Sequence, residues 1–228
     1  MDKDSCLLVA KTKVLKGFER PFNDWYSSHL PKRLRAPGFS WGFRFQSAHG
    51  DSSYLALYEI KNTSYLNSLL NIDISERHPI LASPAFNEPP IGLEKAEIGV
   101  YRLAHSEPKE GRFLSEDNLI TTETWDWSAE GDKKVLSRQC DELYLAEALN
   151  YPEYTAAWRF ERLIHPDIDY TNRMPRNFAI FEHSDILESS LLDAPKLSSK
   201  AKALFHNHSI ETFEPLSKHW ASGKKRAS

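Results

Sequence analysis

The segment Pro37-Gly-Phe-Ser-Trp-Gly-Phe-Arg-Phe45 returns, in altered form, as Pro152-Glu-Tyr-Thr-Ala-Ala-Trp-Arg-Phe160. The two segments lie 115 residues apart, and five of their nine positions are identical or aromatic in both. A proline opens each segment, and an arginine flanked by two aromatic residues closes it. This match predicts that the chain of 228 residues contains two copies of one structural unit.

Three further blocks recur in the same order, at residues 54–60 and 177–183, 66–70 and 187–192, and 7–14 and 119–127. The separation is 123 residues for the first of these pairs, so the second copy carries eight extra residues upstream of it. The insertion falls in the polar, proline-containing segment 165–175, as expected for a loop. Four blocks in one order indicate a duplication.

Each copy is predicted to run strand, helix, strand, strand, helix, strand. In the first copy, the expected strands are residues 7–14, 40–47, 54–60 and 97–103, and a second helix starts within 63–70. The first helix is expected where Phe22, Trp25, Tyr26 and His29 recur at helical spacing, and Pro31 and Pro37-Gly38 should stop it. This βαββαβ order is the ferredoxin-like motif of the α+β class.

A ferredoxin-like sheet has helices on one face and leaves the other uncovered, and a second copy in the same chain can cover that face. We expect the first repeat at residues 1–105, a polar linker at 106–118, the second repeat at 119–220 and a solvated tail at 221–228. The chain would then be a monomer that mimics a dimer, or a homodimer.

Composition excludes several classes of function. A formal net charge of −3 with interspersed charges argues against nucleic-acid binding. No apolar run of membrane-spanning length and no leader is evident, so we expect a cytoplasmic protein without membrane contact. Cys6 and Cys140 form neither a disulfide framework nor a zinc motif. The aromatic content of 12% indicates either dense packing or a pocket for a flat, apolar ligand.

The stretch Trp25-Tyr-Ser-Ser-His-Leu-Pro-Lys-Arg-Leu-Arg-Ala-Pro-Gly-Phe39, followed by Tyr54-Leu-Ala-Leu-Tyr-Glu-Ile60, resembles EthD-like proteins of the dimeric α+β-barrel superfamily. The resemblance covers most of residues 5–220. It implies that two sheets form a barrel, with a ligand cavity in each copy between the sheet and its first helix. The superfamily includes cofactor-free monooxygenases, isomerases, cyclases, haem enzymes and proteins without assigned activity, so fold does not choose among these.

His29 is the first candidate for a catalytic group. It follows Phe22 and Tyr26 on one helix face, and a histidine can act as a general base near neutral pH. A core or capping histidine is the alternative. The matched position in the second copy is Tyr144, which could orient a carbonyl or act as an acid but is a poor base.

Arg44 and Arg159 occupy equivalent positions on a predicted central strand. They would either bind a substrate oxyanion or form structural ion pairs, with Glu59 and Glu182 as possible partners. Glu123 alternates with Trp125 and Trp127 on one strand face. If that face lines a cavity, Glu123 is a candidate base; if it packs on helices, the tryptophans are core.

The predicted catalytic residues are therefore His29, Glu123, Arg44 and Tyr144. The predicted substrate-binding residues are Tyr26, Trp25, Trp41, Tyr58, Trp125, Trp158, Arg159 and His183. His206 and His208 would point to different sides of a helix and no third ligand is evident, so we expect no metal. No Gly-rich phosphate loop is present, and we expect no cofactor.

These residues favour a cofactor-independent lyase, isomerase or cyclase that performs acid/base catalysis on a small apolar or aromatic molecule in the barrel cavity. A non-catalytic small-molecule binding protein and a cofactor-free monooxygenase are the alternatives.

Overall fold

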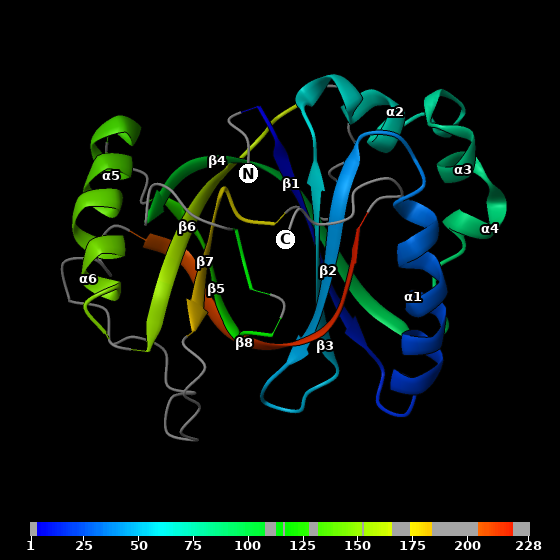
Figure 1. The fold of residues 1–228 in the computed structure, drawn as a ribbon, viewed down its shortest axis with the longest axis horizontal. Coiled ribbons are helices and arrows are strands. Elements are labelled where there is room, and N and C mark those ends of the chain that lie inside the picture. Colours follow the sequence, from blue (N-terminus) through cyan, green and yellow to red (C-terminus); the bar gives the residue numbers. More distant parts are fainter. Residues whose placement is uncertain are drawn as a thin grey trace. The chain divides into compact units, whose positions relative to one another are not determined.

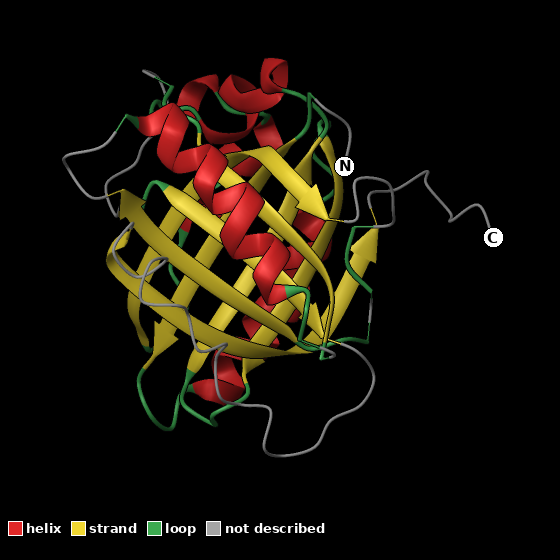
Figure 2. Ribbon diagram, turned by 90° about the vertical axis from the view of Figure 1, so that its left-hand side faces the viewer, coloured by secondary structure: helices red, strands yellow, loops and turns green. Residues whose placement is uncertain are grey.

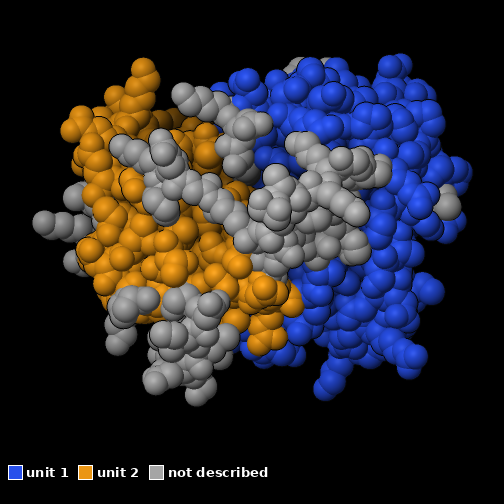
Figure 3. All heavy atoms as spheres, viewed as in Figure 1, with its two compact units in different colours: residues 1–102, 163–173, 216–228 blue, residues 103–162, 174–215 orange. Residues whose placement is uncertain are grey.

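The computed structural model describes residues 4–107, 113–115, 117–127, 132–151, 153–165, 174–183 and 205–220. The chain forms two compact units, shown in blue and orange in Figure 3. Unit 1 comprises residues 1–102, 163–173 and 216–228, and unit 2 comprises residues 103–162 and 174–215. The predicted tail and the predicted second helix of the second copy lie outside the described residues, as do residues 108–112 and 116 of the predicted linker.

Unit 1 contains the first βαββαβ copy (Figure 1). Its antiparallel strands are β1 (Cys6–Val14), β2 (Phe39–Ser47), β3 (Ser53–Ile60) and β4 (Leu93–Glu107), in the order β4-β1-β3-β2. The last residues of β4, from Leu103 on, belong to unit 2. The helix α1 (Glu19–Arg33) connects β1 to β2. Between β3 and β4 lie short helices: η1 (Thr63–Tyr65), α2 (Leu66–Leu70), η2 (Ile74–Glu76), α3 (Pro79–Ala82) and α4 (Pro84–Asn87).

Unit 2 repeats the sheet. Its strands are β5 (Ile120–Trp127), β6 (Tyr154–Arg162), β7 (Asn177–His183) and β8 (Phe205–Trp220), in the order β8-β5-β7-β6. The last residues of β8, from Leu216 on, belong to unit 1. The helical segment after β5 consists of α5 (Lys133–Gln139), the π-helical η3 (Cys140–Leu145) and α6 (Ala146–Ala148), and Figure 2 shows it lying across the strands. All eight strands belong to one closed barrel, ordered β1-β3-β2-β8-β5-β7-β6-β4, so the predicted α+β barrel is confirmed.

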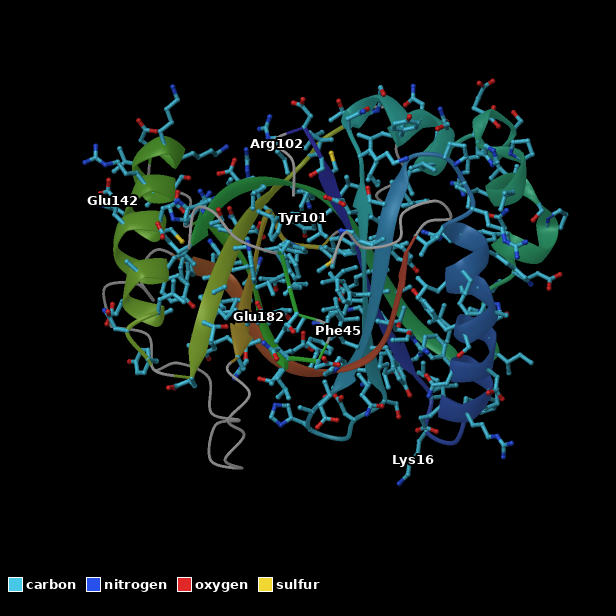
Figure 4. The ribbon with its side chains drawn as sticks, viewed as in Figure 1. Lys16, Phe45, Tyr101, Arg102, Glu142 and Glu182 are labelled. Atoms are coloured by element: carbon cyan, nitrogen blue, oxygen red, sulfur yellow. The ribbon has the colours of Figure 1, made fainter. Side chains whose placement is uncertain are left out.

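Alternation along the strands of unit 1 separates two buried faces. Tyr26 and Leu30 of α1 pack with Leu8 and Tyr58 of the sheet in one hydrophobic cluster. The opposite face of β2 carries Trp41, Phe43 and Phe45, which are also buried. Figure 4 shows Phe45 on the side of its strand that faces away from α1. The sheet therefore has large side chains on both faces, although only one face carries helices.

The helix α1 ends at Arg33, before Pro37-Gly38 as predicted, but it continues past Pro31, which does not stop it. Pro31 lacks the N–H that would bond the carbonyl of residue 27. Ser27 lies on the exposed side of the helix, where water can hydrate that carbonyl. Proline is therefore tolerated within the last turn of the helix, which ends at Arg33.

None of the described helices is long and apolar enough to cross a membrane.

Gly38 makes the sharp turn into β2 possible. Its φ is +107°, and a Cβ atom there would lie 2.6 Å from Cγ of Tyr65. Its carbonyl also accepts a hydrogen bond of 2.8 Å from the backbone N–H of Lys61. We expect Gly38→Ala to lower the free energy of unfolding by about 2 kcal/mol or more, from backbone strain and overpacking together.

Urea-induced unfolding followed by circular dichroism measures this change. Gly50→Ala is the matched control, because Gly50 also has a positive φ of 70° but a Cβ there meets no atom within 4 Å. The control should lose less stability than Gly38→Ala. Equal losses would show that contact with Tyr65 does not matter.

Candidate functional site

A cavity of about 310 Å³ lies within unit 1, between α1, the strands β1 and β4, and the segment that leads into β4. Its apolar walls are formed by side chains from all of these elements, among them Leu8, Ala10, Phe22, Leu69, Leu81, Phe86, Ile98 and Val100. The cavity is on the helix-covered side of the sheet. This is the place, between the sheet and its first helix, that the resemblance implied for a ligand cavity in the first copy.

His29 is a central group of this cavity. Its imidazole stacks between the rings of Trp25 and Phe86, with centroid distances of 4.1 Å on both sides. Neither ring nitrogen is hydrogen-bonded to another described residue, and neither is fully buried. Burial, together with the positive charges of Arg33 and Lys32, lowers the pKa of His29 to about 3. The ring is thus neutral at pH 7 and can accept a proton.

Two guanidinium groups, of Arg33 and Arg77, also line the cavity. The Arg33 group lies over the rings of Tyr58 and Phe86, at 5.2 Å from each centroid. Its Nε atom is buried without a hydrogen-bond partner among the described residues. Arg77 is held in place by a 2.6 Å hydrogen bond from Nε to the carbonyl of Asn71. The cavity therefore combines aromatic walls with two guanidinium groups and one carboxylate, that of Glu88. The guanidinium groups suit a flat molecule that carries or develops an oxyanion.

Arg44 does not line this cavity. Its guanidinium lies under α1, where it donates to the Asn23 side chain and faces the rings of Phe22, Tyr26 and Tyr54 at 4.4–5.2 Å. Burial lowers its pKa. The expected ion pair with Glu59 is wrong, because Glu59 is one residue from Tyr58 and points to the opposite face of β3. Arg44 instead supports the helix that carries His29.

Arg159 is likewise buried beneath the first helix of its own unit. It donates to Asp141 at 2.5 and 2.9 Å, to Glu161 at 2.9 Å and to Ser137 at 2.6 Å. Burial acts to lower its pKa, but these carboxylates outweigh burial and raise it. Its partners are thus Asp141 and Glu161 in place of the expected Glu182, which accepts a hydrogen bond from Asn118 at 3.1 Å.

Of the other predicted site residues, only Tyr26 and Trp25 line the cavity of His29. The Tyr58 hydroxyl lies 3.1 Å from that of Tyr26. Trp41 lies on the opposite face of the sheet, next to Phe43. In unit 2, Trp158 contacts Phe113, whereas Glu123, Tyr144, Trp125 and His183 lie on the helix-covered face. The four predicted catalytic residues therefore divide between two units.

The face of β5 that carries Trp125 packs on the helices of unit 2. The sequence left open whether this face lines a cavity or packs on helices, and the second alternative holds. Trp125 is core, yet Glu123 on the same face is fully buried and contacts His208 at 3.1 Å.

Arg33 and Phe86 were missed by the sequence analysis. Arg33 is four residues after His29 in α1, so helical spacing alone could have identified it. Phe86 is 57 residues away from His29 in a short helix that carries no motif, and only tertiary structure brings the two rings together.

No family model matches the chain, and no curated protein matches its sequence at a significant level. Solved structures do match its fold. An anthrone oxidase-like protein shares 13% identity at a TM-score of 0.64, covering 100% of this chain and 97% of that one. A putative monooxygenase from Fusobacterium nucleatum shares 10% identity at a TM-score of 0.59, with 96% of both chains covered.

A putative chlorite dismutase shares 14% identity at a TM-score of 0.56, covering 95% of this chain and 96% of that one. These similarities support the dimeric α+β-barrel fold, and none of them singles out the EthD-like proteins. At such identities they show the fold alone.

The low pKa of His29 makes stability depend on pH. An unfolded histidine has a pKa of about 6.5, so between that value and about 3 the unfolded chain binds more protons than the folded one. The contribution of His29 to stability is therefore present above pH 6.5 and falls by about 1.4 kcal/mol per pH unit below pH 6.

We expect His29→Phe, which keeps the aromatic stack, to lose less stability than the unchanged protein between pH 7 and pH 4.5. Urea unfolding at the two pH values measures the difference. An NMR titration in which the His29 imidazole titrates near pH 6.5 would contradict this prediction.

Proposed function

We propose that unit 1 is a cofactor-independent monooxygenase that uses dioxygen to oxidise an aromatic molecule with an acidic C–H or phenolic O–H group. The observation that carries the proposal is the neutral His29 imidazole, held in an aromatic cavity with free nitrogens beside the Arg33 guanidinium. The names of the anthrone oxidase-like and monooxygenase structures support this choice over a lyase or isomerase.

The cavity suits a flat substrate of a few rings. Its volume is at the lower end for small-molecule sites. The rings of Trp25, Phe86 and Phe22 can stack on such a substrate, and the aliphatic residues of β1 and β4 can cover its other face.

His29 would take the proton that the substrate loses. A histidine with a pKa near 3 is a weak base, so the substrate must itself be acidic and its anion must be stabilised. A ring CH2 group between two aromatic rings, conjugated with a carbonyl, meets the first condition because its anion is an extended enolate. Arg33 meets the second, because its guanidinium can pair with the enolate oxygen.

The electron-rich enolate is the species that dioxygen oxidises. The CH2 carbon loses two hydrogens and gains one oxygen atom as a ketone, and the second oxygen atom leaves as water. One dioxygen is thus consumed for each ketone formed. Proton transfer and charge stabilisation are the contributions of the protein's own residues.

Anthrone is the substrate with which we would test the proposal, with dioxygen uptake and quinone absorbance followed together and corrected for spontaneous oxidation. We expect His29→Phe and Arg33→Met to lower kcat/KM at least tenfold, since general-base and oxyanion contributions are typically worth 10²-fold or more. His49→Phe is the matched control, because His49 is exposed in the β2–β3 turn.

Other results would favour the remaining functions. Binding of anthrone without turnover would support a binding protein. Exchange of the ring CH2 protons with deuterated solvent without dioxygen uptake would support isomerase-type or lyase-type chemistry. Unchanged rates in both variants would remove His29 and Arg33 from the reaction.

A further inference from the structure

A second cavity, of about 650 Å³, lies within unit 2. It is bordered by the helical segment α5 to α6, by the ends of β4, β5 and β6, and by the residue before β7. The His29 cavity lies beside the first and last strands of its copy, whose counterparts in unit 2 are β5 and β8. None of the described β8 residues lines the cavity of unit 2, so the two cavities occupy different places in the repeat.

Side-chain size explains why this space is open in unit 2. In unit 1 the rings of Phe22, Tyr26 and Tyr54 surround the guanidinium of Arg44. At the separations of 115 and 123 residues between the copies, these three positions in unit 2 are taken by Ser137, Asp141 and Asn177. The first two of them accept hydrogen bonds from the guanidinium of Arg159, the counterpart of Arg44, which supports this correspondence. Three rings are therefore replaced by short polar side chains, two of which line the cavity.

The four carboxylates that line the cavity already have partners. The pairs are Asp141 with Arg159 at 2.5 Å, Glu161 with Arg159 at 2.9 Å, Glu142 with Arg138 at 2.8 Å, and Glu107 with His105 at 3.4 Å. Three of these carboxylates are thus paired with arginines that belong to the same unit. A cationic ligand would have to compete with those arginines, which argues against a site for a cation.

Three positive side chains of the cavity stand differently. Lys133 and Lys134 line it from the start of α5, and Arg176 lines it from the residue before β7. Within the part of the chain that the structure describes, none of the three forms an ion pair with a carboxylate. Positive charges that converge on a hollow attract an anion, and an arginine can hold a carboxylate through two parallel hydrogen bonds.

Trp127, the last residue of β5, gives the cavity an aromatic wall close to Arg176. Its ring is half-buried, with one side 5.9 Å from the ring of Trp125. Arg176 lies at the same edge of the sheet, because Trp125 pairs with Asn177 and the backbone N–H of Arg176 donates to Asp126 at 2.8 Å. An aromatic ring and a guanidinium group on adjoining strands suit a ligand that combines an aromatic ring with an acid group.

We propose that this cavity binds an aromatic acid of two or three rings. The carboxylate pairs with Arg176, Lys133 and Lys134 provide further positive charge from the helix, and the rings stack on Trp127. The volume lies in the middle of the range of small-molecule sites, which leaves room for more than one ring. This site is separate from the His29 cavity and does not rest on the function proposed for unit 1.

Calorimetric titration of the full chain with 2-naphthoate tests the proposal, with 2-naphthylmethanol and 2-naphthylmethylamine as neutral and cationic probes of the same ring system. We expect 2-naphthoate to bind at least tenfold more tightly than either, because only its carboxylate accepts charge-assisted hydrogen bonds. Arg176→Met and Trp127→Leu should each weaken its binding tenfold or more. Arg35→Met is the matched control, because it removes an exposed arginine that lines neither cavity, and it should leave binding unchanged.

Further variants locate the bound acid, because an aromatic anion can also enter the cavity of Arg33 in unit 1. The double variant Lys133→Met with Lys134→Met should weaken binding in unit 2. Arg33→Met should leave that binding unchanged, whether or not a second molecule binds in unit 1. The NMR signals of the His105 imidazole, which lines the cavity of unit 2, should shift on binding. Thermal unfolding of each variant checks that it is folded.

Four results would overturn the proposal: no binding of 2-naphthoate, equal or tighter binding of the amine, equal effects of Arg176→Met and Arg35→Met, or binding that is lost only in Arg33→Met. If Trp127→Leu fails to fold, Arg176→Met and the double lysine variant decide, because these side chains lie outside the buried core. None of these measurements involves dioxygen, so this site and the function proposed for unit 1 can fail independently.

Discussion

In both units a guanidinium group is buried between the sheet and the first helix, and the packing of the helix depends on it. A buried charge must be compensated by nearby groups, because its removal from water costs several kcal/mol. Arg44 is compensated by Asn23 and three aromatic rings, and Arg159 by two carboxylates and a serine. The compensating groups come partly from the helix, so the arginine determines which helix face meets the sheet.

The consequences for the two units differ because the compensation differs. In unit 1 the aromatic groups that surround Arg44 include Phe22 and Tyr26, which also line the cavity of His29. In unit 2 the helix contributes Asp141, and the segment that follows α5 is π-helical. Tyr144 lies within this π-helical segment, facing the sheet beside the Glu123 carboxylate. The same arrangement of sheet and helix thus surrounds an apolar cavity with basic groups in unit 1 and a buried carboxylate, that of Glu123, in unit 2.

Much of the fold could be predicted from the sequence. The repeated proline-aromatic turn and the strand alternation are local patterns, and local patterns encode strand and helix positions directly. The site was predicted less completely. His29, Trp25 and Tyr26 were found because they share one helix, whereas Phe86 comes from a distant short helix without a motif. Glu123 was found, but its partner His208 was not, because that residue was assigned to a helix and lies on a strand.

By itself, the sequence determined the duplication, the order of strands and helices, and the presence of an arginine at the same strand position in each copy. Tertiary structure decided which face each side chain occupies and which distant residues meet. It placed Arg44 under α1 and Trp41 on the opposite face, and it separated His29 from Glu123. The physical reason is that alternation along a strand defines two faces, but only the packing of helices on one of them determines which face becomes a site.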